Sequence, residues 1–195
     1  MSVNLVDPRV GIAAQPWVAV ALVIGAVVSA ALALFVGGEI LSDPGGVQGL
    51  AWVAAWLLPP LVLSALALRW PDTAYLLLVA VVGLACVVSV GGVVWAQALW
   101  EFEDAHGPVN LLVLVAVLIP LIALGRSLPW EAGWLMVVAL AVPLALQAVS
   151  LGVVGEWSVI PVLVLVAAPY AVVAVLLIVG GRRARPPEPV TEGRA

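Results

Sequence analysis

The chain contains six long apolar runs separated by short polar gaps, and this pattern constrains its fold more than any other feature. The runs cover approximately residues 17–36, 50–68, 74–99, 109–124, 134–154 and 159–179. A helix needs about 20 apolar residues to cross the hydrocarbon core of a bilayer, and the fourth run is short by this measure. Because 65% of the 195 residues are hydrophobic, a soluble core of this size could not bury them. The sequence therefore predicts an all-α membrane protein with six transmembrane helices in a compact bundle.

The basic residues of the chain are all arginines, and each falls in a gap or tail on the same side of the six runs. They are Arg9, Arg69, Arg126, Arg182, Arg183, Arg185 and Arg194. Because basic residues are retained on the cytoplasmic side during insertion, this alternation predicts that both termini are cytoplasmic. The lack of lysine and the abundance of Ala, Val, Leu and Gly suggest a GC-rich bacterial genome. We therefore expect a multi-pass protein of the bacterial inner (plasma) membrane.

The chain is expected to have three segments. Residues 1–16 form a cytoplasmic N-terminal segment, residues 17–181 form the six-helix transmembrane domain, and residues 182–195 form a cytoplasmic tail. The tail is rich in proline and arginine and cannot build a core, so it is predicted to be disordered. The nine tryptophans lie near the ends of the runs, where indoles favour the headgroup region, and this supports the span boundaries.

Two gaps on the predicted cytoplasmic side resemble each other. Residues 68–77 and 125–136 each carry an arginine, a proline, an acid and aromatic residues before a new apolar run. Pro71 and Pro129 suit the first position of a helix, and Asp72 and Glu131 would complement the positive end of the helix dipole. The likeness predicts that helices 2–3 and 4–5 form a parallel hairpin repeat. The alternative is a chance likeness between apolar sequences.

The central parts of the runs contain no Asp, Glu, Lys, Arg or His, so the usual marker of a proton relay or an ion pathway is missing. Prolines in four of the runs should free backbone carbonyls inside the membrane. The carbonyls freed near Pro143 and Pro169, together with Gln147 and Tyr170, form a candidate intramembrane pocket. The alternative interpretation is that these groups serve only helix packing.

Small residues predict where helices approach each other closely. Gly25 and Ser29 are four residues apart on the first run, which places them on one face of a helix. The third run is punctuated by Gly83, Ser89, Gly91 and Gly92, which predicts that this helix is central. The glycine pairs at 37–38 and 180–181 are expected to mark helix ends. Cys86, the single cysteine, is expected to be a small packing residue.

One polar cluster lies outside the runs, on the predicted outer side. Its candidate ligands are Glu101, Glu103, Asp104 and His106. Three carboxylates and an imidazole could bind a divalent cation or act as an acid–base pair, but their spacing matches no established metal motif. We therefore predict a solvated turn, with no metal and no cofactor.

These observations favour a non-enzymatic protein that acts as a subunit or scaffold of a membrane assembly. Its expected partners are membrane lipids, together with other membrane proteins or a second copy of the chain, and no nucleic acid is expected. The alternative is a transporter or carrier of a neutral or lipidic small molecule, which the prolines and the hairpin repeat would suit. An enzyme acting through the outer cluster is a third hypothesis.

Overall fold

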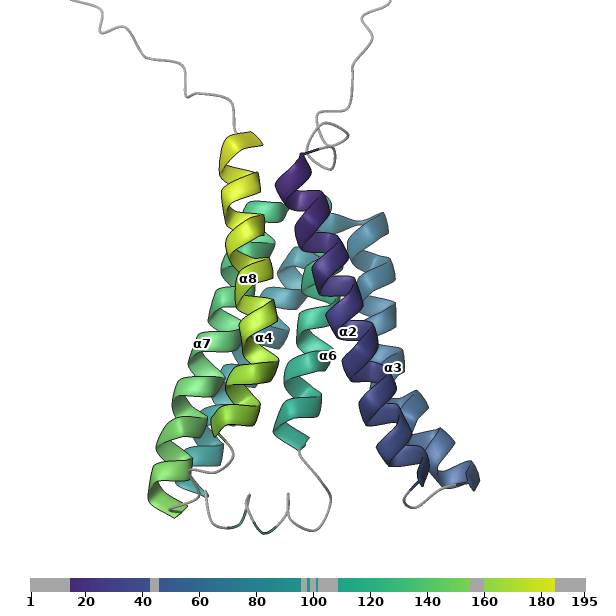
Figure 1. Cartoon of the computed structure of the whole chain (residues 1–195), viewed down its shortest axis with the longest axis vertical. Coiled ribbons are helices and arrows are strands. Elements are labelled where there is room, and N and C mark those ends of the chain that lie inside the picture. The colour runs from purple at the N-terminus through teal and green to yellow at the C-terminus, as the bar shows by residue number, and fades with distance from the viewer. Residues whose placement is uncertain are drawn as a thin grey trace, which may run out of the picture.

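A computed structural model describes residues 15–42, 46–95, 98, 101, 109–154 and 160–184 of the chain. The elements described are six helices and no strands (Figure 1). They are α2 (Pro16–Ser42), α3 (Gly46–Arg69), α4 (Pro71–Val94), α6 (Val109–Leu124), α7 (Pro129–Val154) and α8 (Ile160–Ala184). Five of them are long and apolar enough to cross a membrane, and α6 is a shorter apolar helix. The all-helical class is confirmed for the described residues.

The two arginine-containing turns are built as the sequence predicts. α4 and α7 begin at Pro71 and Pro129, with Asp72 and Glu131 in their first turns. Only Trp70 separates α3 from α4, whereas residues 125–128 form a hydrogen-bonded turn between α6 and α7. The two turns therefore differ in length, and the hairpin repeat stays a prediction.

Both glycine pairs expected at helix ends lie inside helices. α2 continues through residues 37–38 to Ser42, and α8 continues through residues 180–181 to Ala184. A glycine costs about 1 kcal/mol relative to alanine in a helix, but an apolar environment penalises an unpaired backbone group more heavily. The helical ladder therefore persists through the glycines. The segment expected as a tail from residue 182 begins inside α8, and residues 185–195 lie outside the described residues.

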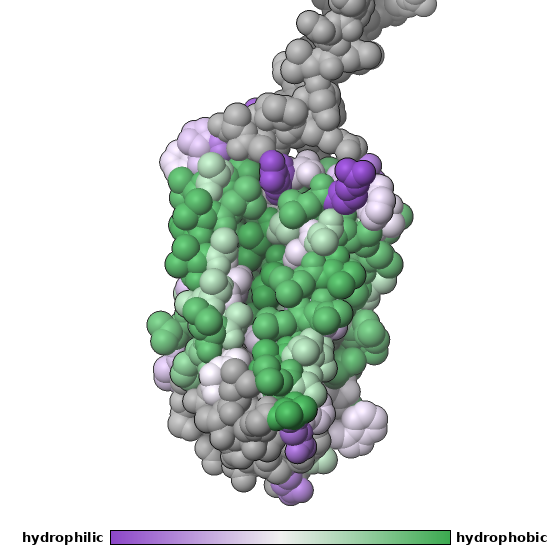
Figure 2. Space-filling view, turned by 90° about the vertical axis from the view of Figure 1, so that its right-hand side faces the viewer, coloured by the Kyte–Doolittle hydropathy of each residue, from purple (hydrophilic) through white to green (hydrophobic). Residues whose placement is uncertain are grey.

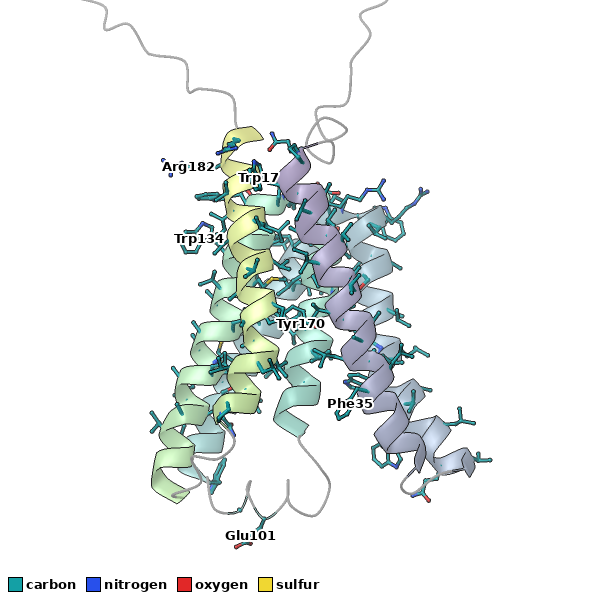
Figure 3. The ribbon with its side chains drawn as sticks, in the orientation of Figure 1. Trp17, Phe35, Glu101, Trp134, Tyr170 and Arg182 are labelled. Carbon is teal, nitrogen blue, oxygen red and sulfur yellow. The ribbon has the colours of Figure 1, made fainter. Side chains whose placement is uncertain are left out.

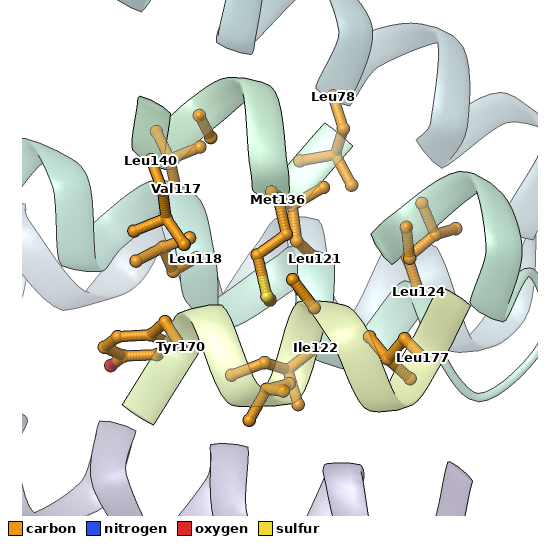
Figure 4. Close-up of a cluster of buried hydrophobic side chains, with 14 of the residues drawn as sticks. Leu78, Val117, Leu118, Leu121, Ile122, Leu124, Met136, Leu140, Tyr170 and Leu177 are labelled. Carbon is orange, nitrogen blue, oxygen red and sulfur yellow. The ribbon is translucent and has the colours of Figure 1, made fainter. Parts of the chain in front are cut away.

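The helix with the most enclosed position is α6, which contacts α2, α3, α4 and α7. Its buried side chains include Val117, Leu118, Leu121 and Leu124, and they meet side chains of α4, α7 and α8 in the core (Figure 4). The prediction that the third run is central is wrong. On α4, an added Cβ at Gly83 would meet nothing within 4 Å, and one at Gly91 would meet only Trp95. The sequence of α6 is almost entirely apolar, which suits a helix that contacts four others, and only Val113 near its start is exposed among its described side chains.

The arginine-bearing turns and the last turn of α8 lie at one end of the molecule, which we call the arginine end. Figure 3 places Arg182 and Trp17 at this end and Glu101 at the opposite end. α2 and α3 diverge together from α7 and α8 toward the opposite end (Figure 1). The face shown in Figure 2 is apolar along the middle of the helices, with hydrophilic residues near both ends.

The buried core lies in the half of the molecule nearest the arginine end. We call the remainder the open half; it consists of residues 30–42, 46–59, 83–94, 109–114, 141–154 and 160–166. Among the described side chains of the open half, none is buried, and its only buried residues are Gly37 and Gly49. The compact bundle expected from the sequence is therefore not confirmed, because the fully buried side chains lie in one half of the described structure and the open half adds only partly buried ones, such as Leu32, Cys86 and Leu144.

Glycine contacts explain why the packed half is tight. An added Cβ would lie within 3.0 Å of a neighbouring atom at each of five glycines, all in the packed half: Gly25, Gly125, Gly133, Gly180 and Gly181. At Gly37, Gly38 and Gly83, in the open half, it would meet nothing within 4 Å. Helix association in lipid depends on van der Waals contact, so close approach at small residues is the source of cohesion in this half.

Candidate functional site

The most deeply buried polar side chain that sequence analysis selected is Tyr170, on α8. Its side chain is fully buried, and its hydroxyl lies 3.1 Å from the hydroxyl of Ser29 on α2, with either group able to donate. Ser29 is itself buried. A tyrosine at this depth needs a hydrogen-bond partner for its hydroxyl, and Ser29 supplies one. Ser29 shares with Gly25 the helix face that the sequence predicts for packing, and nothing in the sequence links it to Tyr170.

The surroundings of this hydroxyl pair are apolar. Tyr170 belongs to the buried cluster that includes Leu118 and Val117 of α6 and Leu140 of α7 (Figure 4). Figure 3 shows Tyr170 partway along the molecule, between the two ends. Two neutral hydroxyls in such a setting can donate and accept hydrogen bonds, but neither is an acid or a base near neutral pH. The pair can therefore hold helices together or bind a neutral polar group.

The register of α7 against α8 is set by glycine contacts. An added Cβ at Gly181 would lie 2.5 Å from the backbone nitrogen of Trp130. One at Gly133 would lie 3.0 Å from the backbone nitrogen of Ile178. The two helices are therefore antiparallel and in close backbone contact near the arginine end.

Extending this register shows which of the candidate pocket residues lie at the same depth. Pro143 and Pro169 lie at nearly the same depth along the helix axes, and Tyr170 is the next residue after Pro169. Gln147 lies four residues beyond Pro143 on α7, about 6 Å further into the open half at 1.5 Å of rise per residue. Two prolines and the tyrosine thus mark the boundary between the packed and open halves, and Gln147 lies beyond it. The pocket stays a prediction.

Other intramembrane hydroxyls are bonded to their own helices. Ser64 donates to the carbonyl of Pro60 at 2.7 Å, and Ser89 donates to the carbonyl of Ala85 at 2.8 Å. Within the described part of the chain, every buried side-chain nitrogen or oxygen has a hydrogen-bond partner. Such satisfied groups stabilise helix geometry and packing, and this favours the packing interpretation of the polar residues.

The candidate outer cluster is described at only one position. Glu101 is exposed at the end opposite the arginines (Figure 3), whereas Glu103, Asp104 and His106 lie outside the described residues. Across the residues that are described, no three His, Cys, Asp or Glu side chains are grouped so as to hold a metal ion. Cys86 is a partly buried free thiol on α4.

We predict that the purified protein holds no stoichiometric metal at Glu101, Glu103, Asp104 and His106. Neighbouring residues of a turn diverge unless a rigid frame makes them converge, and zinc needs three or four convergent ligands. Metal analysis after mild dialysis measures this directly. A stoichiometric transition metal that is lost in the His106→Ala variant would contradict the prediction and would support an enzyme on this face.

Comparison with known proteins adds no identity to this geometry. The chain matches no protein-family model, no curated protein and no solved structure.

Proposed function

We propose that this protein is a non-enzymatic subunit of a membrane assembly in the bacterial inner membrane, and that its partners are other membrane proteins. The observation that carries the proposal is the confinement of the core to one half of the molecule. The described part of the open half exposes large apolar side chains on all six helices, for example Phe35 on α2, Trp52 on α3 and Val87 on α4.

Apolar side chains that are exposed to lipid do not by themselves indicate a protein partner, because lipid tails are as apolar as leucine. The divergence of the helices is the stronger argument. Helices in a bilayer associate through van der Waals packing, and α2 and α3 separate from α7 and α8 in the open half, where no described side chain is fully buried (Figure 1). A transmembrane helix of a partner would supply that packing. The Tyr170–Ser29 bond supports the same proposal, since both hydroxyls are engaged in holding α8 to α2.

Photocrosslinking from two positions on α4 tests the proposal. Leu76 and Val87 are 69% and 68% exposed, and eleven residues place them on nearly the same face of the helix. A photoreactive residue at Val87, in the open half, is expected to form adducts with another membrane protein at native expression levels. The same residue at Leu76, in the packed half, is the matched control and is expected to form lipid adducts. Lipid adducts alone at both positions would refute the subunit proposal.

We further propose that the arginine end faces the cytoplasm. Reporter fusions after Thr73, Ser127 and Pro187 are expected to give cytoplasmic signals, and fusions after Ser42, Asp104 and Glu156 to give signals from the outer compartment. The reason is that the reverse orientation would carry all seven arginines across the membrane. One fusion with the opposite signal, in a protein of normal abundance, would require a different topology.

A carrier of a neutral or lipidic molecule is the second candidate. It is favoured by the placement of Pro143, Pro169 and Tyr170 at the boundary of the open half, where a ligand entering between diverging helices would stop. The Gln147→Leu variant separates the two candidates. A residue that only packs is expected to tolerate this change, since an interhelical hydrogen bond contributes only about 0.6 to 2 kcal/mol. Loss of a cellular phenotype at unchanged protein level would favour the carrier.

A further inference from the structure

The last turn of α8 emerges where three helices meet. An added Cβ at Gly180 would lie 2.6 Å from Cγ2 of Val18 on α2, and the next residue, Gly181, is equally close to the backbone of α7. Gly180 and Gly181 therefore let α2 and α7 contact α8 at the same depth along its axis. Arg182 and Arg183 follow immediately, and both side chains are exposed.

An indole ring lies close to the second of these two arginines. The guanidinium of Arg183 lies 5.7 Å from the centroid of the Trp17 ring, at the start of α2. On α7, Trp130 and Trp134 pack edge to face with centroids 5.8 Å apart, and Trp134 is exposed. Indoles favour the depth of the lipid headgroups and the glycerol backbone. The arginines are therefore held at the level at which lipid phosphates lie.

Stacking on an indole leaves the hydrogen-bonding edge of a guanidinium available. A guanidinium that lies with its flat face against an indole keeps its N–H donors pointing outward in the plane of the group. That planar fork matches two oxygens of a phosphate. The described residues of the arginine end include four arginines and two acids, Asp72 and Glu131. The net charge of this end is therefore positive.

We propose that Arg182, Arg183 and Trp17 form a binding site for the phosphate of an anionic phospholipid headgroup. Basic sites between transmembrane helices on the cytoplasmic side bind such headgroups, whereas zwitterionic lipids offer no net charge to them. The Gly180–Gly181 contacts make the site specific to this corner, because they fix Trp17 of α2 beside the end of α8. The inference does not depend on a protein partner in the open half.

Lipid titration of the purified protein in neutral detergent tests the site. Native mass spectrometry gives the affinity for phosphatidylglycerol relative to phosphatidylcholine. The Arg182→Gln/Arg183→Gln variant is expected to lose about 30-fold in affinity for phosphatidylglycerol, from roughly fivefold for each arginine. The matched control is Arg69→Gln/Arg126→Gln, which removes the same charge from the same end on other helices. It is expected to lose less than about threefold, because charge effects fall off within a Debye length.

Replacement of the indole separates a built site from general surface charge. Trp17→Leu keeps every arginine, and it is expected to weaken phosphatidylglycerol binding by about two- to fivefold through loss of the exposed cation–π contact. All variants are compared at matched helicity and monodispersity. Equal losses in the two double-arginine variants, no effect of Trp17→Leu, or equal affinity of the wild type for both lipids would each overturn the proposal.

Discussion

Replacing Tyr170 by alanine is expected to reduce the free energy of unfolding by about 3 kcal/mol. The side chain is fully buried among α6, α7 and α8, so its removal leaves a cavity whose lining loses van der Waals contacts. The hydrogen bond to Ser29 is lost as well. Denaturation of the protein in bicelles, followed by far-UV circular dichroism or by steric trapping, measures the change.

Tyr170→Phe is the matched control, because it keeps the ring and removes only the hydroxyl. We expect it to cost about 0.6 to 1.7 kcal/mol, as interhelical hydrogen bonds do in membranes. Ser29→Ala should cost a similar amount, and the double variant should cost less than the sum of the two, since they remove the same bond. A Tyr170→Ala protein as stable as the wild type would show that this side chain does not hold α8 in place.

The Gly133→Ala substitution is expected to destabilise the protein by about 1 to 3 kcal/mol, although alanine is the better helix former. The added Cβ would lie 2.6 Å from Cγ1 of Ile178 and 3.0 Å from the backbone oxygen of Ala174. A flexible side chain could move aside, but the backbone of α8 cannot do so without separating the two helices. The same unfolding measurement applies.

Gly83→Ala on α4 provides the control for Gly133→Ala. Its added Cβ would meet nothing within 4 Å, so only the gain in helix propensity remains, and unchanged or slightly increased stability is expected. Equal effects of the two substitutions would mean that the close contact between α7 and α8 contributes nothing to stability.

The contrast between these glycines shows which parts of the fold the sequence could predict. The helices were predictable because backbone groups in lipid must be paired within a helix and the bilayer sets the helix length. The limits of α6 and the proline starts of α4 and α7 agree with the sequence for this reason. Helix contacts were not predictable, because side chains that face lipid and side chains that face another helix are equally apolar. Gly83 and Gly133 look alike in sequence, yet only Gly133 lies against a neighbour.

The candidate site also has one part that the sequence could predict and one part that it could not. That Tyr170 needs a partner could be predicted from the cost of an unpaired hydroxyl in an apolar environment. The identity of the partner could not, since Ser29 lies 141 residues away and several other hydroxyls were available. Ser64 and Ser89 bond to their own helices, and no sequence pattern separates them from Ser29.

The pairing of α2 with α8 has a consequence for biogenesis. Ser29 and Tyr170 are separated by 141 residues, which a ribosome adds in roughly 7 to 28 s at about 5 to 20 residues per second. During this interval α2 is already in the bilayer, while its glycine and serine face has no α8 to pack against. Closure of the packed half is therefore a late event of synthesis, and until then lipid or the insertion machinery must occupy the position that α8 finally takes.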